Sequence, residues 1–316
     1  MTETAEVSKT RAWVMAARPQ TLPAAAAPVV VGTAVAAYGD VFDPLAATMA
    51  FVGAALIQVG TNFANDYYDA KQGADTEDRE GFTRVTAGGL IEPGEVKRAM
   101  VLTFALAVIS GTYLVYVAGV PILVVGLVSV ACGVAYTGGP YPLGYHGLGD
   151  VFVFVFFGLV AVTGTYYVQA AAVLGKPLAT GLVAVPDLGL ALVASLPVAA
   201  LSTNILVVNN VRDREEDART GKETVVVKFG YRFGRAEYVT MLAVAYLTPV
   251  ALVVALDAPL PVLAAWLSLP LAVSVARTVL TRTDGAALNP ALERTGQLLA
   301  LYSILFALGF LAPVVV

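Results

Sequence analysis

The sequence has few charged residues and a single cysteine. Asp, Glu, Lys and Arg make up 13% of its 316 residues, whereas soluble proteins carry roughly 25%. So few charges cannot cover a soluble globule of this size, and the composition also excludes a disordered tail protein and a coiled coil. Because Cys132 is the one cysteine, no intramolecular disulfide can form, which excludes a small disulfide scaffold.

Positive charge is not in excess either. The formal net charge is −4, so the basic footprint typical of nucleic-acid binding is missing and we expect no nucleic-acid partner. Charged residues continue up to Arg18, and no short apolar segment with a cleavage site precedes the first long one. We therefore expect no cleaved signal peptide.

Apolar residues, in contrast, make up 58% of the chain. A membrane-spanning helix needs about 20 mostly apolar residues, and nearly charge-free windows of this kind recur along the sequence. They lie at residues 20–38, 45–65, 99–117, 121–137, 151–173, 188–209, 238–256, 259–276 and 296–316. The sequence therefore predicts an all-α, polytopic membrane protein with nine transmembrane helices in a single domain, residues 1–316.

The basic residues predict how the chain lies across the membrane. If the N-terminus is cytoplasmic, 18 of the 19 Lys and Arg residues fall on the cytoplasmic side and Lys176 alone falls outside, which satisfies the positive-inside rule. The C-terminus then lies outside. The long charged loops 66–98 and 212–237 lie inside, and loops of this length tend to be functional. We expect a multi-pass protein of the cell membrane with cytoplasmic active-site loops.

Two acidic clusters end two of the predicted helices. The second window runs into Asn62, Asn65, Asp66 and Asp69, and in a continuing helix Asn62, Asp66 and Asp69 share one face. The sixth window ends in a matching set of amides and carboxylates: Asn209, Asn210, Asp213 and Asp217.

Both clusters are unfavourable for a helix without a ligand. Carboxylates four residues apart repel one another, and near a helix C-terminus they oppose the macrodipole. A divalent cation reverses both effects, and hard oxygen ligands suit Mg²⁺ shared with substrate phosphates. We predict this role for Asp66, Asp69, Asp213 and Asp217. The neighbouring acidic residues are interpreted as solvated loop charge: Glu77, Asp78, Glu215 and Glu216.

Basic residues accompany both clusters. Lys71, Arg84 and Lys222 lie beside or just after the carboxylates. Cations mixed with metal ligands favour a diphosphate, because they neutralise the charge that grows on a leaving group. For each of these cations, attraction to lipid head groups is the alternative interpretation.

A diphosphate held at the membrane rim, with apolar helices behind it, indicates an isoprenoid tail buried in the membrane. Ionisation of an allylic diphosphate creates a carbocation, which aromatic faces can stabilise. The candidate aromatic residues are Tyr67, Tyr68, Tyr136, Tyr166, Tyr167, Phe152, Phe154, Phe156 and Phe157. For any one of them, lipid or packing surface is the alternative.

Short motifs extend along most of the chain. They are Ala17-Arg18-Pro19-Gln20-Thr21-Leu22-Pro23, Asn65-Asp66-Tyr67-Tyr68-Asp69, Arg84 with Gly88-Gly89-Leu90-Ile91, Gly147-Leu148-Gly149-Asp150, Asn209-Asn210-Val211-Arg212-Asp213 with Asp217, and Gly221-Lys222-Glu223-Thr224. With these motifs the sequence resembles the UbiA superfamily of intramembrane prenyltransferases, and within it the 1,4-dihydroxy-2-naphthoate polyprenyltransferases of menaquinone synthesis.

The resemblance implies a fold and a site. The fold is nine transmembrane helices around a central cavity open to the cytoplasm and laterally to lipid. Two Mg²⁺ ions are implied, with the ligands Asn65, Asp66, Asp69, Asp213 and Asp217. The implied catalytic residues are Asp66, Asp69, Asp213, Asp217 and Lys222. The implied substrate-binding residues are Asn62, Asn65, Lys71, Arg84, Tyr136, Asp150, Asn209, Asn210 and Arg212.

The resemblance also implies the reaction. A polyprenyl group passes from polyprenyl diphosphate to 1,4-dihydroxy-2-naphthoate, which loses its carboxylate as CO₂ and gives demethylmenaquinone. Two alternatives keep the chemistry and change the acceptor to 4-hydroxybenzoate or geranylgeranylglyceryl phosphate. A cation-coupled transporter is a remote third alternative, since transporters place charged sites near the bilayer midplane.

Some positions depart from the family pattern. A third aspartate often follows the first motif, and here that position is Gly73, with Asp75 or Asp78 as possible replacements. The loop 137–149 carries no Lys or Arg. His146 is either a proton acceptor for the naphthol or a solvent-facing loop residue. We place the acceptor ring beside Tyr166, Tyr167 and Gln169.

Overall fold

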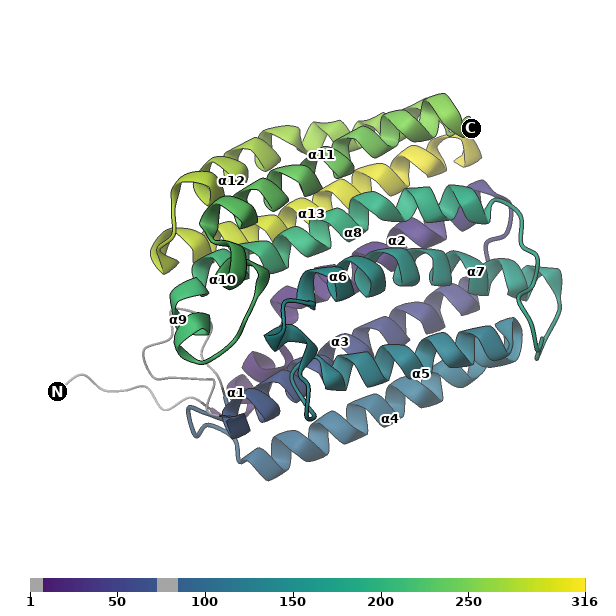
Figure 1. Ribbon diagram of the computed structural model, residues 1–316. Helices are drawn as coiled ribbons and strands as arrows, with labels where there is room; N and C mark the ends of the chain where they lie inside the picture. The colour runs from purple at the N-terminus through teal and green to yellow at the C-terminus, as the bar shows by residue number, and fades with distance from the viewer. Residues whose placement is uncertain (1–7, 73–84, 316) are drawn as a thin grey trace.

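The computed structural model describes residues 8–72 and 85–315, which form an elongated bundle of helices (Figure 1). The N-terminal part comprises α1 (Lys9–Ala17), α2 (Leu22–Tyr38), α3 (Pro44–Gln72), α4 (Pro93–Ala118) and α5 (Val120–Ala135). The middle part comprises α6 (Gly149–Val153), the π-helical segment η3 (Phe154–Val160) and α7 (Ala161–Leu174). The C-terminal part comprises α8 (Leu188–Arg212), α9 (Arg214–Arg219), α10 (Val225–Phe229), α11 (Tyr231–Ala255), η4 (Leu260–Ser268), α12 (Leu269–Thr281) and α13 (Gly285–Val315).

Eight helical segments in the described ranges are long and apolar enough to cross a membrane. The remaining predicted window, 121–137, corresponds to α5, an apolar helix of 16 residues that is shorter than the others. Gly119, with φ +78°, separates α4 from α5, as expected where the apolar stretch must turn back. The polytopic, all-helical prediction is confirmed, and the number of nine crossings stays a prediction because α5 is shorter than the eight long segments found among the described residues.

Helix α8 is the most deeply buried of the long helices, with 72% of its most apolar window inside the structure. It packs against α11, α13 and η3, whereas α3 packs mainly against α4. Figure 1 shows α8, α11, α12 and α13 on one side of the bundle and α3, α4 and α5 on the other. The helices α2, α6 and α7 lie between these two groups.

The π-helical segment η3 lies in close contact with α8. A Cβ atom added at Gly158 would lie 2.0 Å from the Cβ of Ala199, so no side chain fits between the two backbones. Single π-helical turns inside α-helices are rare and often lie at functional sites. Here η3 packs against α8 and also contributes to the lining of the cavity described below.

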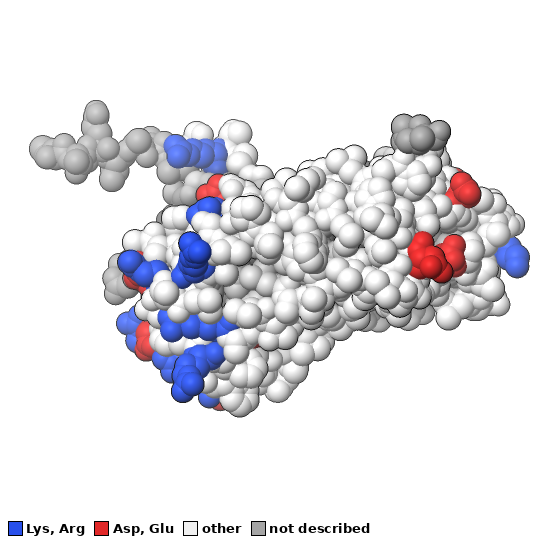
Figure 2. Space-filling view, turned by 90° about the horizontal axis from the view of Figure 1, so that it is seen from above, with Lys and Arg blue, Asp and Glu red and all other residues white. Residues whose placement is uncertain are grey.

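Charged residues are distributed unevenly along the length of the molecule. Figure 2 shows Lys and Arg side chains gathered at one end of the elongated body. The long middle section of this face is almost free of charge. A few acidic residues and one basic group lie at the other end. We call the end where α3 and α8 terminate the motif end; it is at the left in Figure 1.

Candidate active site

A cavity of about 1040 Å³ opens at the motif end and extends between α3 and α8. Its polar portion is lined by Asn65, Asp69, Asp213, Asp217 and Lys222. Farther in, the lining becomes mostly apolar, with Val108, Ile122 and Val168 among the contributors. The cavity therefore combines a charged mouth with a deep apolar interior.

The two acidic motifs meet at this mouth. Lys222 Nζ lies 4.0 Å from Asp69 Oδ1, although the residues belong to segments far apart in the chain. Tyr145 also contacts both, because its hydroxyl donates to Asp69 Oδ1 at 2.6 Å and its ring lies 4.7 Å below Lys222 Nζ. A cation and a carboxylate are thus held together in a place where both are almost fully buried.

The second motif is held by its own arginine. Arg212 donates from Nε and Nη2 to the two carboxylate oxygens of Asp213, at 2.6 and 2.8 Å. Its third donor, Nη1, reaches Asn289 Oδ1 on α13 at 2.9 Å. A bidentate pair of this kind fixes the plane of the carboxylate. Helix α13 therefore takes part in positioning Asp213.

Asp66 takes a position that differs from its predicted role. Its carboxylate is 1% exposed and does not line the cavity. It accepts hydrogen bonds from the backbone of Val85 and Thr86 and from the Thr86 hydroxyl, and it lies 3.9 Å from Arg18 Nη2. The carboxylate oxygens of Asp66 thus hold the segment that begins at Val85, and the metal role of Asp66 stays a prediction.

Two further predicted binding residues lie outside the cavity lining. Lys71 is exposed at the end of α3. Asp150 is buried behind Asn210, whose amide lies 3.4 Å from Asp150 Oδ1. The structure therefore gives Asp150 an indirect place in the site, through Asn210, which does line the cavity. Arg84, Asp75 and Asp78 lie outside the described residues.

The remaining predicted residues are at the cavity. They are Asn62, Asn65, Tyr136, Asn209, Asn210 and Arg212. The Asn65 amide oxygen accepts a hydrogen bond from the Thr137 hydroxyl at 3.0 Å. Four of the candidate aromatic residues line the cavity: Tyr136, Phe152, Phe156 and Phe157. The rings of Phe152 and Phe156 are stacked, with centroids 5.7 Å apart.

The predicted acceptor pocket on α7 is wrong. Tyr166, Tyr167 and Gln169 do not line the cavity. Their side chains tie α7 to its neighbours: the Tyr166 hydroxyl donates to Pro186 O, the Tyr167 hydroxyl accepts from Val183 N, and the Gln169 amide donates to Thr33 Oγ1. These side chains serve packing, because they face neighbouring segments of the protein and not the cavity.

His146 is half-buried in the loop before α6. Its ring stacks on Tyr141 with centroids 3.6 Å apart, and its Nδ1 lies 2.8 Å from Pro142 O. It does not line the cavity. The neighbouring Tyr145, which the sequence did not single out, supplies the contact with the acidic motif instead.

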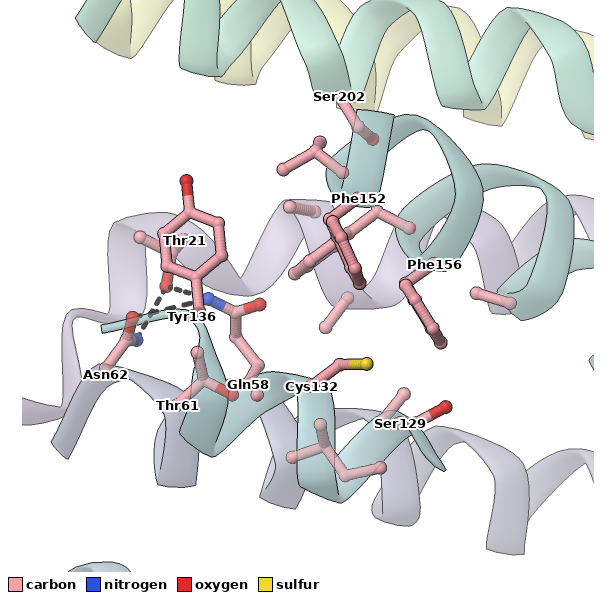
Figure 3. A pocket seen from close by; sticks show the side chains of 18 of the residues that line it. Thr21, Gln58, Thr61, Asn62, Ser129, Cys132, Tyr136, Phe152, Phe156 and Ser202 are labelled. Carbon is pink, nitrogen blue, oxygen red and sulfur yellow. Dashed lines mark hydrogen bonds between the residues drawn. The ribbon is translucent and has the colours of Figure 1, made fainter. Parts of the chain in front are cut away.

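A network of amides and hydroxyls lines one wall (Figure 3). Thr21 Oγ1 donates to Arg18 O at 2.8 Å and accepts from both Gln58 Nε2, at 3.0 Å, and Asn62 Nδ2, at 2.9 Å. Asn62 Nδ2 also donates to Ala17 O. The segment between α1 and α2 is thereby fixed to the cavity face of α3.

Arg18 lies at the cavity, although the sequence analysis gave it no role beyond its place in the first motif. It lines the cavity, and its backbone takes a left-handed conformation with φ 51°. Non-glycine residues in this conformation store strain and are concentrated at functional sites. The sequence signal for this role was the motif Ala17–Pro23, which contains Arg18 and Thr21 and lies just before the first long helix.

The oxygen donors at the mouth fit Mg²⁺. Within residues 8–72 and 85–315, no three His, Cys, Asp or Glu side chains form a ready-made metal cluster. Mg²⁺ commonly takes one or two carboxylates and fills its other positions with water and substrate phosphate. Asn65, Asp69, Asp213 and Asp217 supply carboxylate and amide oxygens to one cavity, so this donor set suits a shared Mg²⁺–phosphate site.

Comparisons with known proteins agree with this geometry. The profile of the UbiA prenyltransferase family matches residues 25–312. The chain is 40% identical to the 1,4-dihydroxy-2-naphthoate octaprenyltransferase of Escherichia coli (strain K12), over 96% of each chain. It is 37% identical to the enzyme of the same name from Mycobacterium tuberculosis (strain ATCC 25618 / H37Rv), over 93% of this chain and 95% of the relative.

Solved structures show the same fold. A UbiA homologue from Aeropyrum pernix K1 in the apo state superposes with a TM-score of 0.66 at 12% identity, over 91% of this chain and 98% of that one. A UbiA homologue from Archaeoglobus fulgidus bound to GPP and Mg²⁺ gives 0.60 at 14% identity, over 93% and 99%.

Proposed function

Because the chain belongs to the UbiA prenyltransferase family and is a prenyltransferase, we propose that it transfers a polyprenyl group from polyprenyl diphosphate to 1,4-dihydroxy-2-naphthoate. The bond between the prenyl C1 and the diphosphate oxygen breaks, and a carbon–carbon bond forms at the ring. The ring carboxylate leaves as CO₂, and its bonding electrons restore the aromatic ring. The products are diphosphate and the quinol form of demethylmenaquinone.

One structural observation carries this proposal. Lys222 and Asp69, together with Asp213 and Asp217, line the mouth of a cavity whose interior is apolar. A ligand with a charged head and a long hydrocarbon tail matches both portions. The naphthoate acceptor is supported by relatives that carry this activity in their names over almost the full length of the chain.

The charged residues at the mouth have separate tasks. We assign two Mg²⁺ ions to Asn65, Asp69, Asp213 and Asp217. When bound, Mg²⁺ neutralises the charge that develops on the departing diphosphate. Lys222 donates to the diphosphate oxygens, and Tyr145 keeps its ammonium group over the mouth through the cation–π contact.

Apolar and aromatic residues protect the reacting carbon. Phe152 and Phe156 stack beside each other in the lining, and Tyr136 lies between them and the mouth. Their faces stabilise an allylic carbocation without acting as bases. The apolar lining also keeps water from competing with the acceptor for this cation.

For the membrane arrangement we propose nine crossings, with α5 as the short one, and a cytoplasmic motif end. The clustering of Lys and Arg at one end of the body supports this orientation. The C-terminus then lies outside the cell membrane, and the cavity opens to the cytoplasm and sideways to lipid.

Purified protein in detergent or vesicles, supplied with farnesyl diphosphate, MgCl₂ and one acceptor at a time, tests the proposal. We expect a prenylated, decarboxylated product from 1,4-dihydroxy-2-naphthoate. A product from 4-hydroxybenzoate or geranylgeranylglyceryl phosphate, with none from the naphthoate, would overturn the choice of acceptor. Cation uptake into vesicles without any prenylation would overturn the enzymatic reaction itself.

A further inference from the structure

Buried polar atoms without a hydrogen-bond partner point to a place where a ligand completes the bonding. In the described part of the chain such atoms occur on six residues: Gln58, Gln169, Ser202, Asn204, Glu237 and Ser303. Two of these residues, Gln58 and Ser202, line the cavity. Gln58 is 7% exposed and Ser202 is 3% exposed, so both are more than nine-tenths buried.

The orientation of the Gln58 amide follows from its neighbours. Thr21 has one hydroxyl hydrogen, which it donates to Arg18 O, so Thr21 Oγ1 can only accept from Gln58. Asn62 donates its amide hydrogens to Ala17 O and Thr21 Oγ1, so its oxygen also accepts from Gln58. The NH₂ group of Gln58 must therefore face this network. Its oxygen, Oε1, is left as a hydrogen-bond acceptor on the cavity side.

Ser202 differs from the other hydroxyl residues of α8. Ser195 donates to Leu192 O, and Thr203 donates to Ala199 O. Such bonds to the preceding turn are the usual way in which helical hydroxyls are satisfied. The Ser202 hydroxyl makes no such bond and lies in the cavity lining.

The two residues lie at the same depth on facing walls. Gln58 precedes Asp69 on α3 by eleven residues, and Ser202 precedes Asp213 on α8 by the same number. Both helices run toward the motif end, so each residue is about 16 Å along its helix from the acidic motif. Figure 3 shows Gln58 and Ser202 on opposite sides, with Phe152 and Phe156 beside the space between them.

A prenyl chain cannot satisfy these atoms, because burying an unpaired amide or hydroxyl against hydrocarbon is costly. A flat ring with two hydroxyl groups satisfies both and fits beside the aromatic rings. Resting on the proposed function, we propose that Gln58 and Ser202 are the hydroxyl-recognition pair for the dihydroxynaphthoate acceptor. Gln58 Oε1 accepts a hydrogen bond from one ring hydroxyl, and Ser202 Oγ bonds with the other.

The test compares the dihydroxy acid with its two monohydroxy analogues, 1-hydroxy-2-naphthoate and 4-hydroxy-2-naphthoate. Inhibition constants for each analogue are measured against 1,4-dihydroxy-2-naphthoate, together with the KM of the dihydroxy acid. In the wild-type enzyme we expect each analogue to bind about tenfold or more weakly than the dihydroxy acid, since each leaves one buried partner unpaired. Gln58→Leu should remove the discrimination against one analogue, and Ser202→Ala against the other.

The chain offers matched controls. Gln169 and Ser303 are buried, each has an unpartnered oxygen, and neither lines the cavity. Gln169→Leu and Ser303→Ala should therefore leave the discrimination unchanged. The KM for farnesyl diphosphate and thermal unfolding in detergent show whether each variant retains its fold. If Gln58→Leu does not fold, Gln58→Asn is used instead. This variant keeps the amide group on a shorter side chain and should weaken the discrimination against the same monohydroxy analogue.

Failure of this pair is distinguishable from failure of the proposed function. Absence of any product from 1,4-dihydroxy-2-naphthoate in the wild-type enzyme refutes the reaction. Normal turnover with unchanged discrimination in both Gln58→Leu and Ser202→Ala refutes the recognition pair alone. The same refutation follows if the control variants lose discrimination to an equal extent.

Discussion

Arg18 O and Gln58 Nε2 are joined through a single hydroxyl, that of Thr21, which donates to the first at 2.8 Å and accepts from the second at 3.0 Å. The strained residue before α2 therefore determines which end of the Gln58 amide faces the cavity. Thr21→Val removes the hydroxyl and releases this constraint. We expect a several-fold higher KM for the acceptor with little change in the KM for prenyl diphosphate, measured in steady-state assays. A larger effect on prenyl diphosphate than on the acceptor would contradict the assignment.

Asp69 is expected to be more important for turnover than its neighbour Asp66. Asp69→Asn removes one charge from the mouth and should lower kcat at least about 100-fold, since it weakens stabilisation of the departing diphosphate. Glu215→Gln, an exposed position on α9, is the matched control and should retain wild-type activity. Retention of most activity by Asp69→Asn in a prenyl-transfer assay would contradict the metal–diphosphate site.

Asp66 is expected to act through stability. Asp66→Asn leaves one oxygen for the Val85 and Thr86 donors and should lower the free energy of unfolding by about 1–3 kcal/mol. Thr86→Val, which removes only the hydroxyl bond, should have a smaller effect in the same direction. Thermal unfolding in detergent measures both. An inactive Asp66→Asn enzyme with unchanged stability would instead place this carboxylate on the reaction path.

Removal of divalent cations should stop the reaction. Treatment with EDTA followed by desalting should abolish prenyl transfer, and MgCl₂ should restore it, because the mouth provides oxygen ligands of the type Mg²⁺ prefers. Ca²⁺, which prefers longer bonds and more ligands, is expected to restore much less. Full activity in the presence of EDTA would exclude Mg²⁺ from the reaction.

Gly158 is expected to be intolerant of any side chain. Gly158→Ala places a methyl group 2.0 Å from the Cβ of Ala199 and should destabilise the protein by about 1–3 kcal/mol, as overpacking does. Gly189→Ala, at a helical glycine of α8 with nothing within 4 Å of the added atom, is the control. Equal thermal unfolding of the two variants would show that η3 and α8 separate easily.

Hydropathy and charge predicted most of the helices, because each membrane crossing needs its own long apolar segment and leaves a local signal. The same rules could not find the contact between Tyr145 and Asp69 or that between Arg212 and Asn289. These pairs join segments far apart in sequence, and their geometry depends on how the helices pack. Asp66 shows the limit most clearly. The helical pattern grouped it with Asn62 and Asp69, whereas in the structure its carboxylate accepts hydrogen bonds from the distant residues Val85 and Thr86.

The acceptor pocket was placed on α7 because polar and aromatic residues in a membrane helix attract a functional interpretation. Gln169 instead bonds with Thr33 on α2, whereas Gln58 presents its oxygen to the cavity. Both are isolated glutamines in apolar segments, so sequence context cannot separate them. The distinction arises from which helix face meets the open space.

The π-helical segment Phe154–Val160 carries a consequence for how such a chain can change. A π-helical turn closes i→i+5 hydrogen bonds and so holds one residue more than an α-helical turn. Deleting one residue within this segment would restore a regular α-helical turn and keep Ala161–Leu174 in register with Gly149–Val153. A deletion between Ala161 and Tyr166 would instead rotate the rest of α7 by about 100° and separate Tyr166 and Tyr167 from Pro186 and Val183. A change of length in this crossing is therefore best accommodated in the π-helical segment.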